Sequence, residues 1–145
     1  MAETGMFEDF HDFLHDEIHA YRGEVKEYVY YLPALFRALS GALGSGELSP
    51  DDRRLILAAL GYLVAPHDIV PEDVYGPAGW ADDVLVCSLV LDRLVKKYGL
   101  AFAGRYWEKK TDPLDAFLAH AIAEATSDLG GKAEVVLKFA GLGTI

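Results

Sequence analysis

Acidic side chains gather in the middle of the chain, on both sides of a segment rich in proline and glycine. Four of them could share a ligand: Asp68 and Glu72 within the break, and Asp82 and Asp83 after it. Carboxylate oxygens are the preferred ligands of hard divalent cations such as Mg²⁺, Mn²⁺ and Ca²⁺. If the two pairs meet across the loop, a bound cation could polarise an oxygen and activate water, as in a metal-dependent hydrolase. The adjacent His67 could add a nitrogen ligand or act as a base.

A structural role accounts for the same acids. Asp82 and Asp83 fall in the first turn of a predicted helix, where carboxylates satisfy free backbone amides. Asp68 can fold its side chain back onto the amides that follow it and close a turn. Because apolar sequence flanks these acids closely, we expect them to be partly buried and hydrogen-bonded. The sequence leaves both interpretations open, and the predicted structural corner consists of Tyr62, Pro66, Asp68, Pro71, Gly79, Trp80, Asp82 and Asp83.

Three histidines form a second candidate metal site near the N-terminus. His11, His15 and His19 lie four residues apart, so they fall on one face of a helix. Each neighbouring pair has the spacing that can chelate Zn²⁺ and similar ions through imidazole nitrogens. The alternative is a row of half-buried histidines between core and solvent, which could pack against a second copy of the helix. The sequence lacks the HExxH pattern of a catalytic zinc helix.

Aromatic side chains form a third group. Tyr62 and Trp80 flank the acidic segment, so their polar tips could donate hydrogen bonds to its carboxylates. Aromatics at helical spacing are more typical of a core than of a ligand cage, and we expect most of this group to be core. Its members are Tyr28, Tyr30, Tyr31, Phe36, Tyr62, Tyr75, Trp80, Tyr106 and Trp107.

The charge of the chain limits its partners. With 13 basic and 23 acidic residues among 145, the formal net charge at pH 7 is −10. Such a charge repels nucleic-acid phosphates and anionic lipid head groups, so we expect no nucleic-acid partner. The sequence contains no Gly-rich phosphate loop and no nucleophile elbow, and it leaves open whether the protein is an enzyme. The single cysteine, Cys87, is expected to be a small buried residue.

Apolar residues recur at spacings of three and four along most of the chain, which predicts an all-α fold. We expect a compact bundle of five to seven helices with the acidic Pro/Gly-rich corner in the middle. Ser49-Pro50 and Asp112-Pro113 each place a capping residue before a proline, which is typical of a helix start. The predicted single domain (1–145) comprises an acidic amphipathic helix (1–32), a helix–corner–helix unit (50–98) and C-terminal helices (100–145) expected at 100–110, 114–129 and 132–140.

The order Tyr62-Leu63-x-x-Pro66-x-Asp68-x-x-Pro71, followed by Gly79-x-x-Asp82-Asp83, resembles the signature of the YkvA-like family. The resemblance covers about residues 55–92. That family is catalogued as a domain of unknown function, so the resemblance implies an architecture and no activity. Some of its members are associated with membranes, which leaves peripheral membrane contact open. One departure concerns the acid after the second proline, usually Asp, where this chain has Glu72-Asp73.

These features favour a small soluble helical module that acts by protein binding or oligomerisation. A chain with 52% apolar residues could bury its surplus apolar surface between subunits, as a homo-oligomer or with another protein. The longest apolar runs, 55–66 and 84–91, are shorter than the ~20 residues of a membrane-spanning helix. We expect no transmembrane segment and a cytoplasmic location. The alternative function is that of a divalent-metal-binding protein or metal-dependent hydrolase, holding Mg, Mn, Ca or Zn.

Overall fold

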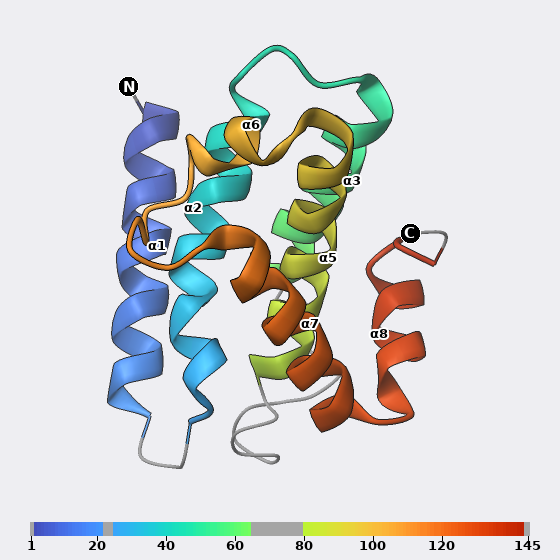
Figure 1. Cartoon of the computed structure of the whole chain (residues 1–145). Helices are drawn as coiled ribbons and strands as arrows, with labels where there is room; N and C mark the ends of the chain where they lie inside the picture. The colour runs from blue at the N-terminus through green and yellow to red at the C-terminus, as the bar shows by residue number, and fades with distance from the viewer. Residues whose placement is uncertain (1, 22–24, 65–79, 144–145) are drawn as a thin grey trace.

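The protein is a bundle of helices in the computed structural model, which describes residues 2–21, 25–64 and 80–143, with side chains from Asp9 onward. Every regular element in these ranges is helical, which confirms the all-α prediction (Figure 1). The elements are α1 (Ala2–Ala20), the 3₁₀ helix η1 (Glu27–Tyr31), α2 (Leu32–Leu43), α3 (Pro50–Val64), α5 (Ala81–Tyr98), α6 (Leu100–Gly104), α7 (Leu114–Leu129) and α8 (Lys132–Phe139).

Helix α5 is the centre of the bundle. It packs against α2, α3, α6, α7 and α8, while α1 lies at the outer edge and packs mainly on α2 and η1 (Figure 1). All side chains from Ala81 to Ser88 are buried, as expected for an apolar run with no exposed face. The helix ends at Gly99, whose φ of 99° lies in the region that favours glycine. Because α5 is surrounded, its polar groups must find partners inside the protein.

The N-terminal third differs from the prediction of a single helix over 1–32, which is wrong in its extent. Helix α1 ends at Ala20, and α2 begins at Leu32 after the separate 3₁₀ helix η1. Pro33 lies in the first turn of α2, where its missing amide hydrogen costs no helical bond. The helix predicted over 100–110 is also too long, since α6 ends at Gly104.

The predicted starts after Ser49 and Asp112 are formed differently. Ser49 accepts a hydrogen bond on Oγ from the amide of Asp52 at 3.2 Å, which confirms it as a capping residue of α3. At the start of α7, Pro113 occupies the capping position and no side chain caps the helix. The carboxylate of Asp112 is instead engaged by Tyr31. Among the described helices, none is both long and apolar enough to cross a membrane.

Candidate functional site

The described part of the predicted corner centres on a buried hydrogen bond. Tyr62, in the last turn of α3, donates its hydroxyl to Oδ2 of Asp82 in the first turn of α5, at 2.7 Å. Both side chains are buried, as is that of the adjacent Asp83. Trp80 is also buried, and its ring stands edge-on to Tyr21 with 4.9 Å between ring centroids. The prediction that these acids are buried and bonded to a flanking aromatic is confirmed for Asp82.

The buried thiol of Cys87 lies close enough to Asp82 and Asp83 for their charges to affect its pKa. Burial raises the pKa of Cys87, and the charges of Asp83 and Asp82 raise it further. The side chain is completely buried and forms no disulfide. Because a thiol held protonated is a poor nucleophile, Cys87 is a packing residue, as the sequence predicted.

The metal hypothesis for the corner rests only in part on described residues. Asp82 and Asp83 lie side by side in the first turn of α5. Asp68 and Glu72, together with Pro66, Pro71 and Gly79, lie outside the described residues. Within the ranges that the structure describes, no three His, Cys, Asp or Glu side chains are grouped so that they could hold a metal ion. The four-carboxylate site therefore stays a hypothesis.

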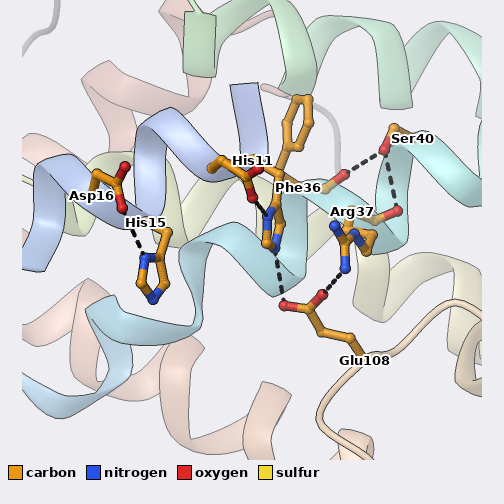
Figure 2. Close-up of polar contacts among 8 residues, drawn as sticks. His11, His15, Asp16, Phe36, Arg37, Ser40 and Glu108 are labelled. Atoms are coloured by element: carbon orange, nitrogen blue, oxygen red, sulfur yellow. Dashed lines mark hydrogen bonds and ion pairs between the residues drawn. The ribbon is translucent and has the colours of Figure 1, made fainter. Parts of the chain in front are cut away.

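The histidine row on α1 divides into two parts (Figure 2). His11 points towards the loop after α6, where its Nε2 lies 3.1 Å from Oε2 of Glu108. Arg37 of α2 donates to the other oxygen of Glu108 at 2.6 Å, so this carboxylate joins α1, α2 and the loop. His15 and His19 are exposed and lie against each other, with 4.3 Å between ring centroids. The half-buried boundary position predicted for the row fits His11.

The most highly connected carboxylate belongs to Asp52, which the sequence analysis did not single out. Its side chain is completely buried at the start of α3. Burial alone would raise the pKa of Asp52, but hydrogen bonds from Lys97, Tyr98, Arg93 and Ser49 outweigh it and hold the pKa well below its usual range. The donor atoms are Lys97 Nζ at 2.7 Å, Tyr98 Oη at 2.6 Å, Arg93 Nε at 3.0 Å and Ser49 Oγ at 2.8 Å.

A signal for this cluster exists in the sequence. Arg93 and Lys97 are four residues apart on α5, so they present two cations on one face, and Tyr98 follows directly. Both cations lie near the end of α5, where they are partly exposed, and such a pair can receive an acid from a neighbouring helix. Asp52 was overlooked because an acid in a first turn already has a local explanation.

Comparisons with known proteins agree with this architecture. Residues 52–89 match the family described as "Protein of unknown function (DUF1232)", with which the YkvA-like resemblance is consistent. The chain is 35% identical over 130 residues to "Uncharacterized protein ORF9" of Methanothermobacter thermautotrophicus, covering 90% of this chain and 88% of that protein. No solved structure matches the chain. The chain therefore belongs to one family with that protein, and it carries the DUF1232 segment over residues 52–89.

Replacing Asp52 by Asn is expected to destabilise the fold by about 2–4 kcal/mol, because the buried network loses its negative charge and one of its two acceptor oxygens. The measurement is urea unfolding followed by circular dichroism. Asp51→Asn is the matched control. It removes the same charge from the neighbouring residue, whose side chain is 81% exposed. Equal effects of the two substitutions would contradict the importance of the network.

The same network predicts a pH dependence. Since the folded-state pKa of Asp52 lies below its unfolded value of 3.8, its stabilisation is complete above that value and is lost as the pH falls below it. The free energy of unfolding of the wild type should therefore decrease between about pH 5 and about pH 2 by more than that of Asp52→Asn. Parallel curves for the two proteins would exclude Asp52 as a source of acid sensitivity.

Removing the Tyr62 hydroxyl tests the corner. Tyr62→Phe should lower the free energy of unfolding by about 1.5–3 kcal/mol, because Asp82 loses a buried donor to its carboxylate. Tyr30→Phe is the control, since that tyrosine is exposed. If both variants unfold at the same denaturant concentration as the wild type, the hydrogen bond carries no net stability.

Proposed function

We propose that the protein acts by binding protein, and that its partner is a second copy of the same chain. The observation that carries this proposal is that α3 is apolar on two sides. Leu57, Gly61 and Val64 follow spacings of four and three, so they share the face that points away from the buried side of α3. Leu57 is 55% exposed and Val64 is 52% exposed. A helix with apolar residues on both sides is typical of one that is covered by a neighbour.

The outward face of α1 offers a complementary surface. Phe13 is 57% exposed, and Asp9, Asp16 and Glu17 surround it at helical spacings. On α3, Arg53 and Arg54 precede Leu57 by one turn and are exposed. Phe13 and the acids around it on α1 can thus contact the apolar stripe of α3 and the arginines beside it. Such charge complementarity favours the matched orientation over others.

Local shape supports the same pairing. A Cβ placed on Gly61 would meet no atom within 4 Å, so no neighbouring group of this chain covers the outward face of α3 at that position. Helix α2 packs against both α1 and α3, which lie on different sides of it (Figure 1). The contact therefore joins α1 of one copy to α3 of another. A heterologous contact of this kind closes into a ring or continues along a chain of copies.

The test is the mass in solution, measured by size-exclusion chromatography with light scattering over a range of concentrations. The wild type is expected to exceed the 15.9 kDa of one chain. Leu57→Glu should dissociate it, because a charge would be buried in the contact. Leu100→Glu is the matched control, since Leu100 is exposed on α6, away from both faces. A monomeric wild type, or equal masses for the two variants, would overturn the proposal.

A charge reversal tests the orientation. Arg54→Glu should weaken association because it places like charges opposite the acids of α1. Adding Glu17→Lys to that variant should restore association, whereas Glu17→Lys alone should weaken it. Arg54 suits this experiment because its side chain is 61% exposed and its only ion pair with a described residue is a 4.0 Å contact to Asp51. Failure of the double variant to recover would argue against contact between these two faces.

A divalent cation at the corner is a second candidate, which the burial of Asp82 and Asp83 favours. Buried adjacent carboxylates are stabilised by hydrogen bonds, by nearby positive charge or by a proton, and a divalent cation can add to such partners. A cation held by Asp68, Glu72, Asp82 and Asp83 would supply that charge. The histidine row offers a weaker site, in which the pair His15 and His19 would take a transition metal such as zinc.

Native mass spectrometry with elemental analysis on untagged protein tests the metal hypothesis. A stoichiometric metal that is lost in Asp68→Asn and Asp82→Asn but retained in His15→Ala would place it at the corner. Loss in His15→Ala alone would place it on α1. Circular dichroism of each variant separates loss of the ligand from loss of the fold. Wild-type protein that stays metal-free in the presence of Mg²⁺, Mn²⁺, Ca²⁺ and Zn²⁺ would contradict both sites.

A cytoplasmic location and peripheral membrane contact stay predictions. The buried free thiol of Cys87 suits a reducing compartment, where cysteines remain unpaired. Fractionation of cells into soluble and membrane material distinguishes the two locations.

A further inference from the structure

A cavity of about 250 Å³ lies between η1 and the first turns of α7. Three residues per turn in a 3₁₀ helix place Tyr28 and Tyr31 on one side of η1. On α7, Phe117 and His120 are three apart and share a face. All four side chains line the cavity, so half of its eight lining residues carry an aromatic ring. The rings of Tyr31 and Phe117 are in contact, with 4.5 Å between their centroids.

Two carboxylates complete the wall. Asp112 lies at the start of α7 and accepts a hydrogen bond from the hydroxyl of Tyr31 at 3.0 Å. Glu27 is exposed at the rim, and none of the described residues forms a hydrogen bond or ion pair with it. Behind the cavity, Asp128 accepts from the Tyr28 hydroxyl at 2.6 Å. The phenols donate to Asp112 and Asp128, and Nζ of Lys26 lies 3.4 Å from Oδ1 of Asp128. The two carboxylates that line the cavity itself are those of Glu27 and Asp112, so its wall is acidic.

The tyrosines respond to this field. Burial raises the pKa of Tyr31, and its hydrogen bond to Asp112 and the charges of Asp112 and Glu27 raise it further. Burial and Asp128 raise the pKa of Tyr28 in the same way, with a smaller contribution from Glu124. Burial, the larger cause, disfavours any charge at this wall, whereas the contributions of Asp112 and Asp128 favour a cation there.

The chain already places an ammonium group beside this wall. Nζ of Lys109 lies 5.7 Å from the centroid of the Tyr31 ring, within the range of a cation–π contact. Lys109 itself does not line the cavity, and its side chain is exposed. It therefore shows which kind of group the ring attracts while leaving the space between η1 and α7 open.

We propose that this cavity binds an alkylammonium group, presented either by a small amine or by a lysine side chain. Aromatic faces and edges beside carboxylates are the combination that recognises organic cations. Glu27 and Asp112 disfavour an anion, and an uncharged apolar ligand would gain nothing from these two carboxylates. The volume is below the range of drug-sized ligands and suits a single head group. This site shares no residue with the proposed contact between α1 and α3.

The probes are butylammonium chloride and its uncharged analogue butanol, titrated into ¹⁵N-labelled protein and followed by amide chemical shifts. Butylammonium should give saturable shifts around residues 27–31 and 112–120, whereas butanol at equal concentration should not. Sodium chloride at matched ionic strength corrects for screening. Equal shifts with butanol, or shifts that do not saturate, would overturn the proposal.

Two exposed positions allow the site to be altered without touching the core. Glu27→Gln should weaken butylammonium binding at least about threefold, because a carboxylate at the rim is lost. Lys109→Gln should strengthen binding, because a positive charge near the Tyr31 ring, which repels the ligand, is removed. Glu134→Gln, an exposed acid on α8, is the matched control and should leave affinity unchanged. If Glu27→Gln behaves like the control, the proposal fails.

The source of the ammonium group follows from a third probe. Nα-acetyl-lysine methylamide presents the same head group on a peptide backbone. Tighter binding of this compound than of butylammonium assigns the site to a lysine of a protein, and the reverse assigns it to a free amine. Binding of neither compound would overturn the proposal.

Discussion

Two hydrogen-bonded contacts to buried carboxylates, one at each end of the α3–α5 pair, fix the register of the bundle. At the start of α3, Asp52 holds Arg93 and Lys97 near the end of α5. At the end of α3, Tyr62 holds Asp82 in the first turn of α5. Asp52 and Tyr62 are ten residues apart, which is about 15 Å along a helix. Apolar side chains between them could slide by a turn at modest cost, but a one-turn shift would leave buried charges without donors.

The remaining elements depend on that pair because α5 is covered on nearly every side. Helix α7 packs along α5, and α2 packs against both α3 and α5. Helix α1 is attached through α2, η1 and the carboxylate of Glu108, which takes Arg37 from α2 and His11 from α1. Helix α1 is thus held by Leu14 and Ile18, which are buried in the core, and by these polar contacts at a half-buried surface. The outward faces of α1 and α3 remain available for a partner.

Apolar periodicity predicted α3, α5 and α7 almost to the residue, because each has a continuous buried face and a Gly or Pro at one end. The same periodicity did not predict the change from an α-helix to a 3₁₀ helix, because the apolar spacing continues through both. Tyr28 and Val29 continue the apolar stripe of α1, yet they lie on a 3₁₀ helix, which spacing alone does not distinguish over one or two turns. The acids of the candidate sites show a related limit. Asp52 lies in the first turn of α3 and Asp112 lies just before α7, where an acid already has a local explanation, and their partners, Lys97 and Tyr31, come from distant sequence.

The acidic composition of the chain affects both the proposed contact between α1 and α3 and the proposed cation site between η1 and α7. Copies that each carry −10 repel one another at distances within the screening length, so association needs a contact where opposite charges meet locally. The exposed pair Arg53 and Arg54 beside Leu57 provides such a place on α3. At the cavity between η1 and α7 the excess of acidic residues favours binding, because acids beside aromatic rings attract a cation rather than another acidic chain. Separate regions of one acidic protein can therefore select different partners by local charge, although the net charge disfavours both nucleic acid and anionic lipid.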